Sequence, residues 1–279
     1  MAILIVATLL SAGFGLVMRA AQLKGCNIWA VGLVNYAIAT LFHGMRALGE
    51  GGGPISSATL LFGLAIGIVY AVDYGLYVPL LDMRGVSITL AMARISVIVP
   101  LLASIMLWRE PLTAWGGVGA VLATVALPLL VLKPRAAQAL SRPALLYGIA
   151  LFVGTGVERT MMKAFQVQSN TGHDALMLTV LFGAACLVTL ANWLRSGPTL
   201  ARKDLFWGVA LGLTNALANL AFLSSLRILP GILVFPFMAS ISLVFAGLFA
   251  RAAWSERITR RESLGMGLAL VAVTLANLR

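Results

Sequence analysis

The chain has 279 residues, of which 61% are hydrophobic and only 10% are charged. A soluble domain of this length must cover its core with polar groups, so the composition excludes a soluble globular protein and indicates an integral membrane protein. The net charge of +11 comes from Lys and Arg residues that lie mostly beside apolar runs, which points to membrane topology and not to nucleic-acid binding.

A helix needs roughly 20 apolar residues to cross the hydrocarbon core of a bilayer. The chain contains ten such runs, and they are continuous rather than alternating, which favours helices over the strands of a β-barrel. Because Met1 leads into the first run without a basic segment, we expect a retained span there and not a signal peptide. The predicted spans are 2–20, 28–46, 58–80, 86–107, 115–132, 144–164, 174–194, 205–226, 230–250 and 262–278.

The two halves of the sequence repeat each other. The segment 108–113 (Trp-Arg-Glu-Pro-Leu-Thr) recurs 146 positions later as 254–259 (Trp-Ser-Glu-Arg-Ile-Thr). Near the start of each half, 18–22 (Met-Arg-Ala-Ala-Gln) recurs 144 positions later as 162–166 (Met-Lys-Ala-Phe-Gln). Each half also holds five predicted spans, and this odd number reverses the membrane orientation of the second copy.

This repetition predicts the architecture. We expect an all-α integral membrane protein with ten transmembrane helices in two inverted five-helix repeats, 1–133 and 144–279, joined by a linker at 134–143. Secondary transporters commonly bind their substrate at the interface of such repeats.

Lys and Arg residues are distributed unevenly between the two sides of the predicted membrane domain. The side that holds the linker has thirteen, and the side that holds both termini has five, which predicts a cytoplasmic linker and external termini. The thirteen are Arg19, Lys24, Arg84, Lys133, Arg135, Arg142, Arg195, Arg202, Lys203, Arg251, Arg257, Arg260 and Arg261, and the five are Arg46, Arg109, Lys163, Arg227 and Arg279.

The repeated turn has the pattern aromatic-x-Glu-x-Leu/Ile-Thr, follows a span that contains proline and precedes a span rich in Gly and Ala. In this it resembles EamA-type members of the drug/metabolite transporter superfamily, and the likeness covers nearly the whole chain. The resemblance implies a ten-helix transporter that exports a small metabolite. It also implies termini in the cytoplasm, opposite to the orientation that the charges predict.

A second resemblance concerns Thr160–Lys163, which is similar to the end of the first helix in small multidrug resistance proteins, distant four-helix relatives. In those proteins an essential carboxylate lies eight residues before the lysine. Here that position is Thr155, and the nearest carboxylate is Glu158, about one turn along. Proton-coupled drug export therefore does not follow from this resemblance.

Asp73 and Arg94 lie inside predicted spans, where a charge costs about 2.5–3.5 kcal/mol on insertion scales. A tight turn is predicted at 82–85. Asp73 lies nine residues before the start of this turn, and Arg94 lies ten residues after Arg84. At about 14 Å from the turn on antiparallel helices, they lie at matching depth and can meet. They form either a structural ion pair or a cavity-lining pair that opens to bind a charged substrate group. The repeat has Asn219 and Ser240 at the matching positions, which slightly favours the second interpretation.

Tyr70, Tyr74 and Tyr77 share the helix face of Asp73 at spacings of three and four residues. This pattern suits helix packing for any one tyrosine, and a cavity wall with hydroxyl groups for the three together.

Four further residues on predicted helices complete the candidate site for substrate binding or coupling. Glu158 is either a proton carrier or a carboxylate bonded to polar neighbours, and Arg159 shares a face with Lys163, whose amine we expect to reach the membrane interface. Asn215 and Asn219 lie one turn apart and either face the cavity or join helices.

Other polar residues are interpreted as structural. Glu110 and Glu256 lie in the repeated turns, where a carboxylate favours the N-terminus of the following helix. Cys26 and Cys186 lie in or beside apolar runs, so we expect neither a disulfide nor a metal site.

The sequence shows no reactive constellation of an enzyme, so we predict no catalytic residues, metal or cofactor. We predict a secondary transporter, an exporter by resemblance, for a small polar or amphipathic metabolite such as an amino acid or amine, with proton coupling left open. The alternative is a flippase of a lipid or lipid-linked sugar on the same scaffold. We expect a multi-pass protein of the bacterial inner membrane, a monomer or weak homodimer, with its site near the midplane between the halves.

Overall fold

The structure, a computed structural model, describes residues 2–49, 55–110, 114–131, 142–168, 173–254 and 260–276. Within these ranges the chain forms helices and no strand, so the predicted all-α fold is confirmed for the described residues. The helices are α1 (Ala2–Leu23), α2 (Ile28–Gly49), α3 (Ser57–Ile95), α4 (Ile98–Met106), α5 (Ala114–Val131), α6 (Arg142–Gln168), α7 (Asp174–Arg195), α8 (Arg202–Ile228), α9 (Gly231–Trp254) and α10 (Arg260–Ala276).

Some parts of the chain are described less fully. Side chains at 78, 81–92 and some positions of α5, α9 and α10 are not described, although the backbone there is helical. Glu256 and most of the predicted linker at 134–143 lie outside the described residues.

Six helical segments among the described residues are long and apolar enough to cross a membrane, and the chain is therefore a multi-pass membrane protein. Helix α6 is not among the six, and it carries Glu158, Arg159 and Lys163 along its length. The count of ten spans and their inversion stay predictions. The six segments are Ala2–Leu23, Ile28–Gly49, Ser57–Tyr77, Asp174–Arg195, Arg202–Ile228 and Gly231–Phe249.

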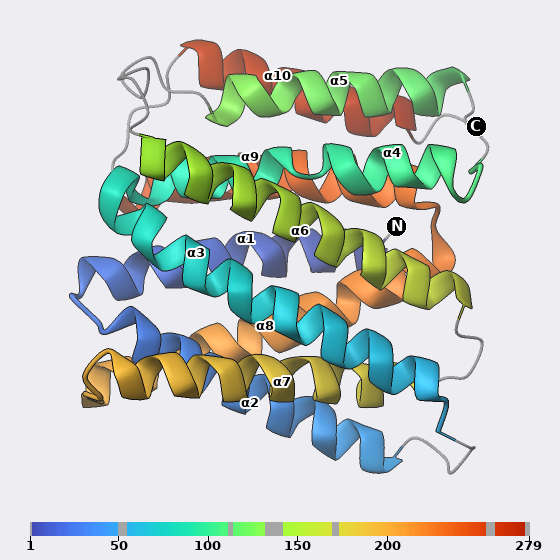
Figure 1. The fold of residues 1–279 in the computed structure, drawn as a ribbon. Coiled ribbons are helices and arrows are strands. Elements are labelled where there is room, and N and C mark those ends of the chain that lie inside the picture. Colours follow the sequence, from blue (N-terminus) through green and yellow to red (C-terminus); the bar gives the residue numbers. More distant parts are fainter. Residues whose placement is uncertain are drawn as a thin grey trace.

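Helix α3 corrects the predicted turn at 82–85. The backbone stays helical through this segment to Ile95 and is interrupted only at 96–97, before α4 begins. The helix is not straight, because a straight helix would separate Asp73 from Arg94 by about 31 Å, yet both line one cavity. Figure 1 shows the ribbon bending sharply at the end of the bundle. Gly85 lies in this segment, and a glycine costs a helix only about 1 kcal/mol. The helix therefore continues through the predicted turn, and the chain reverses its direction by a bend in the helix.

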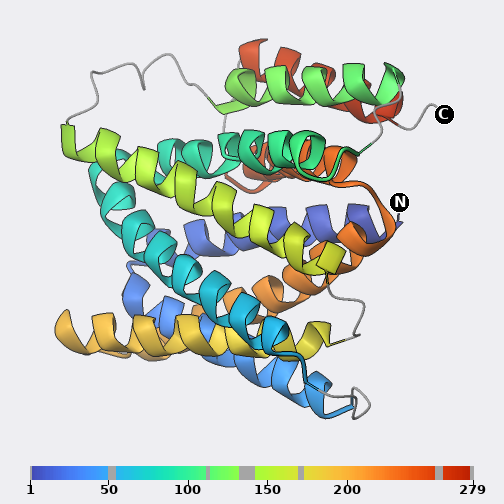
Figure 2. The same ribbon diagram turned by 45° about the vertical axis from the view of Figure 1, so that its right-hand side comes forward.

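The helices pack as a layered bundle (Figures 1 and 2). Helix α2 lies against α7 and α8, α3 lies against α6 and α7, and α1 lies against α8 and α9. Helices α5 and α10 pack against each other at one edge of the bundle. The buried residues of α1, α2, α3, α6, α7, α8 and α9 form one continuous hydrophobic core.

Glycines allow two of these helix pairs to approach closely. On α3, Gly63 and Gly67 lie against α7, where a Cβ at Gly63 would be 2.9 Å from a backbone carbonyl oxygen. On α8, Gly208 and Gly212 lie against α2, where a Cβ at Gly212 would be 2.8 Å from a backbone carbonyl oxygen. Both pairs have the small-x-x-x-small spacing that brings membrane helices together.

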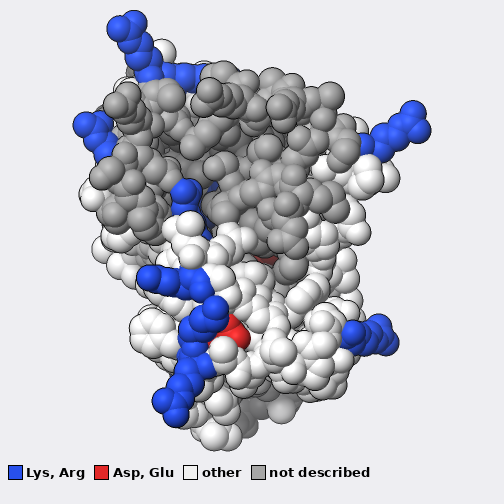
Figure 3. All heavy atoms as spheres, turned by 90° about the vertical axis from the view of Figure 1, so that its left-hand side faces the viewer, with Lys and Arg blue, Asp and Glu red and all other residues white. Residues whose placement is uncertain are grey.

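One end of the bundle is strongly basic. It is the end where α1, α7 and α9 finish and α2, α6, α8 and α10 begin, and Figure 3 shows Lys and Arg side chains projecting from this face. The positive-inside rule predicts that this end is cytoplasmic. The described basic residues near these helix ends include Lys24, Arg142, Arg195, Arg202, Lys203, Arg251, Arg260 and Arg261.

Candidate functional site

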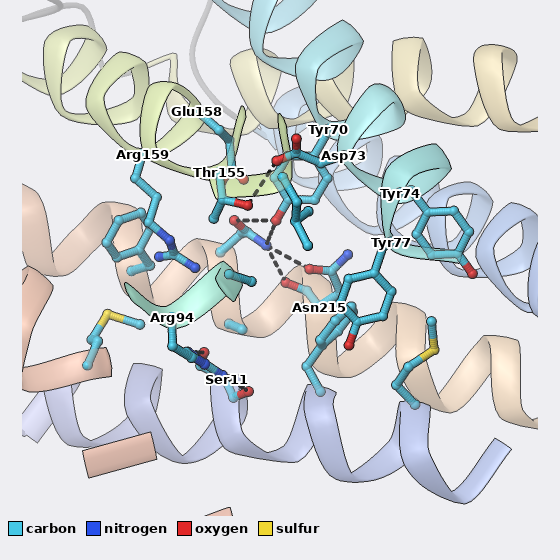
Figure 4. Close-up of a pocket in the computed structure, with 18 of the residues that line it drawn as sticks. Ser11, Tyr70, Asp73, Tyr74, Tyr77, Arg94, Thr155, Glu158, Arg159 and Asn215 are labelled. Carbon is cyan, nitrogen blue, oxygen red and sulfur yellow. Dashed lines mark hydrogen bonds between the residues drawn. The ribbon is translucent and has the colours of Figure 1, made fainter. Parts of the chain in front are cut away.

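A cavity lined by charged, polar and aromatic side chains lies inside the bundle between α1, α2, α3, α6, α8 and α9 (Figure 4). Its empty space, counted together with the solvent at its opening, is about 960 Å³. The structure brings all nine candidate residues to this one cavity. They are Tyr70, Asp73, Tyr74, Tyr77, Arg94, Glu158, Arg159, Asn215 and Asn219.

Asp73 forms an acidic wall of the cavity with Glu158. The Asp73 side chain is buried, and its Oδ2 accepts a hydrogen bond of 3.0 Å from the hydroxyl of Thr155 on α6. Its Oδ1 has no hydrogen-bond donor among the described residues. Glu158 lies one turn beyond Thr155 on α6 and is also buried, at 6% exposure. Two carboxylates therefore line one cavity, and the Thr155 hydroxyl is the one hydrogen-bond donor found for them among the described residues.

Arg94 corrects the predicted pairing. Its guanidinium donates to the hydroxyl oxygen of Ser11 at 3.1 Å and to the backbone carbonyl oxygen of Ser11 at 3.2 Å, and it forms no ion pair with Asp73. Figure 4 shows Arg94 beside Ser11 on α1, away from Asp73 beside Thr155 on α6. The matching depth was necessary for a pair but not sufficient, because the bend in α3 directs the two side chains to different walls.

Arg159 is the second cation of the cavity. Its guanidinium carbon lies 5.1 Å from the centre of the Phe222 ring on α8, a cation–π contact that leaves its N–H groups available. Among the described residues, no ion pair joins Arg159 or Arg94 to Asp73 or Glu158.

An amide network forms the floor between α2, α3 and α8. The side-chain amide of Asn219 donates to Asn215 Oδ1 at 2.8 Å and to the Tyr70 hydroxyl at 3.2 Å. The amide of Asn215 in turn donates to Oδ1 of Asn35 on α2 at 3.1 Å. The two asparagines therefore face the cavity and join helices at the same time.

The three tyrosines of α3 have different hydroxyl partners. Tyr70 joins the amide network, Tyr74 donates to the backbone carbonyl oxygen of Ile28, and Tyr77 has no hydroxyl partner among the described residues. Tyr36 of α2 packs edge-on against Tyr70 and Tyr74, with ring centres 6.1 and 5.7 Å apart. The stripe is thus both a cavity wall and part of the aromatic core.

Several lining residues were missed by sequence reasoning. Ser11 and Thr155 hold the guanidinium and the carboxylate, and the shift of 144 positions that relates the start of the two halves also relates these two residues. That correspondence was the signal that could have found them. The sequence gave no such signal for Tyr36, because a tyrosine in an apolar run is typical of ordinary helix packing.

Lys163 and Glu110 correct two further expectations. The Lys163 amine is not free at the surface, since its Nζ lies 2.7 Å from Oε1 of Glu110 and both side chains are at most 11% exposed. Glu110 does not favour the helix that follows it. Its carboxylate instead accepts backbone N–H groups of Gly231 at 3.0 Å and Ile232 at 2.9 Å, at the start of α9. The orphan donors of that helix end and its dipole explain the placement.

No family model and no curated protein matches the sequence. The fold does match solved structures. One is a crystal structure, described only as that of a protein, that aligns with a TM-score of 0.75 over 98% of both chains at 15% sequence identity. At this identity the likeness shows the fold alone and assigns no ligand.

Proposed function

We propose that the protein is a secondary transporter that moves a small polar or amphipathic metabolite, such as an amino acid or amine, by alternating access. One observation carries the proposal. Two carboxylates and two guanidinium groups line one central cavity without forming an ion pair. Charges at membrane depth face water or a partner and mark substrate or ion pathways.

The chemistry of the cavity fits a substrate that carries both charges. Asp73 lines the cavity and forms no ion pair with a described residue, which suits an ammonium group. Arg94 uses two contacts on Ser11, and a guanidinium has five N–H donors, so it retains donors for a carboxylate. An amino acid satisfies both poles, whereas an amine satisfies only the acidic pole.

The packing of the helices supports two inverted repeats. Exchanging α1 with α6, α2 with α7 and α3 with α8 turns the contact of α1 with α8 into that of α6 with α3, and both are present. The same exchange relates the contact of α3 with α7 to that of α8 with α2, and glycine pairs bring both of these together. This packing and the repeated turn support the proposal that the chain is an EamA-type transporter. Export and a bacterial inner membrane follow from that resemblance.

Transport into sealed liposomes tests the proposal. Purified protein should take up at least one labelled amino acid or amine faster than empty liposomes do, and that compound should raise the melting temperature of the protein. A lipid reporter in the same bilayer should cross no faster than in protein-free controls. Lipid movement without metabolite uptake would overturn the proposal in favour of a flippase. Uptake that ignores an imposed pH gradient would exclude proton coupling.

A further inference from the structure

We infer that Gly154 is a positioning residue, which seats the Asp73 carboxylate against α6 and so fixes the acidic pole of the cavity. The inference rests on the proposed function for its effect on transport. A Cβ at Gly154 would overlap Oδ1 of Asp73, and it would lie 2.9 Å from Cγ and 3.2 Å from Oδ2. The three heavy atoms nearest to such a Cβ thus all belong to this carboxyl group.

Other glycines of the bundle have different neighbours. Gly67 lies against the backbone of α7, and Gly156, two residues further along α6, lies against the side chain of Val99. These contacts are ordinary helix packing. At Gly154 the space left by the absent side chain is filled by a charged group that lines the cavity.

Gly154 and Thr155 act together on the carboxylate. The Thr155 hydroxyl holds Oδ2 at 3.0 Å, and the flat surface of Gly154 receives Oδ1. Any larger residue at 154 would force the carboxylate to rotate away from α6, which breaks the Thr155 bond and moves the negative charge within the cavity. The contacts of Asp73 with Gly154 and Thr155 therefore determine where a cationic group of the substrate is bound.

The contact related to this one by the repeat, between α1 and α8, lacks both parts of the arrangement. The position that matches Gly154 is Leu10, and the position that matches Asp73 is Asn219. The glycine is therefore present at the α3–α6 contact, which holds a carboxylate, and absent from the related α1–α8 contact, which holds an amide. Glycine weakens a helix by about 1 kcal/mol relative to alanine, so a need other than helix formation explains it here.

The test is Gly154→Ala in two backgrounds, the natural chain and Asp73→Ala. In the natural chain the KM for the transported amino acid or amine should rise about 10- to 100-fold, the range expected for losing a hydrogen bond to a charged group. The maximal rate should change much less, and the melting temperature should fall. In the Asp73→Ala background the same substitution should leave the melting temperature unchanged or raise it, because no carboxylate occupies the space beside residue 154.

Gly183→Ala on α7 is the matched control, because its Cβ would come no closer than 3.8 Å to its nearest neighbour. It should leave KM unchanged and should not lower the melting temperature, since alanine favours a helix over glycine. If Gly154→Ala lowers the melting temperature equally in both backgrounds, Gly154 is a packing glycine and the inference is overturned. The comparison of melting temperatures needs no substrate, so it decides the role of Gly154 even if the natural chain transports none of the compounds tested.

Discussion

The protein holds its charges inside the bundle in two different ways. Glu110 and Lys163 form an ion pair of 2.7 Å, and the same carboxylate accepts two backbone N–H groups at the start of α9. One turn from Lys163 along α6, Arg159 lies in a cavity whose charged residues form no ion pair with any described residue. The first arrangement satisfies its polar groups within the protein, and the second leaves them for a ligand or water.

The difference separates scaffold from site on physical grounds. A buried ion pair recovers its desolvation cost only when the geometry is good and further hydrogen bonds complete it, as they do around Glu110. Asp73 has one hydroxyl donor, and its second oxygen has none. Removing a partner should therefore damage folding in the first arrangement and transport in the second.

The largest expected effect is on stability, from Lys163→Met. This change leaves the Glu110 carboxylate buried without its counter-ion, which should cost about 3–5 kcal/mol. The free energy of unfolding in mixed micelles, or the melting temperature in detergent, measures it. Adding Glu110→Gln should recover part of the loss, because no charge is then buried without its counter-ion and the amide oxygen can still accept one of the two N–H groups of α9. A double variant as unstable as the sum of both singles would show that the two residues are not coupled.

The next effect is on transport, from Asp73→Asn and Arg94→Ser, which install the residues found at the matching positions of the other half. Each single variant should reduce transport about 10- to 100-fold with the fold retained. Because the two residues share no partner, their effects on unfolding free energy should add within about 0.5 kcal/mol. Initial rates in liposomes and melting temperatures check both statements. A double variant markedly more stable than either single variant would contradict this expectation, because it would indicate that Asp73 and Arg94 form a direct ion pair.

Much of this comparison was accessible from sequence. Charges inside apolar runs identified Asp73, Arg94 and Glu158, because few side chains other than functional ones are kept at such depth. Depth along a helix also follows from residue number, which is why the candidates converge on one cavity. The spacing of apolar runs likewise predicted most helices to within a few residues.

The partners of these charges were not accessible. Helical periodicity placed Lys163 on the face of Arg159, yet its counter-ion Glu110 lies 53 residues earlier in the chain and reaches it only through the packing of α4 against α6. The bend of α3 set which wall Arg94 faces. Pro79 inside α3 signals a kink, but a proline does not tell which way the side chains beyond it face. Rotation about a helix axis is decided by tertiary packing.

A smaller effect should distinguish two neighbouring tyrosines. Tyr74 donates its hydroxyl to the backbone carbonyl oxygen of Ile28, whereas the Tyr77 hydroxyl has no partner among the described residues. Tyr74→Phe should therefore cost about 1 kcal/mol of stability and leave KM nearly unchanged. Tyr77→Phe should leave stability unchanged and raise KM if the hydroxyl binds substrate. Equal stability losses for the two variants would contradict the assignment of their hydroxyl groups.

The smallest effect is expected at the second described ion pair of the bundle, between Arg227 and Asp174. Their side chains approach to 2.6 Å, but that of Arg227 is 52% exposed, so water competes for it and salt screens it. Asp174 also keeps a hydrogen bond of 3.1 Å from Gln166 and lies in the first turn of α7, where a carboxylate is favoured. Arg227→Gln should therefore cost at most about 1 kcal/mol, and less at high salt, with transport unchanged. The same unfolding measurement as for Lys163→Met checks it, and a loss as large as at Lys163 would show that exposure does not separate the two pairs.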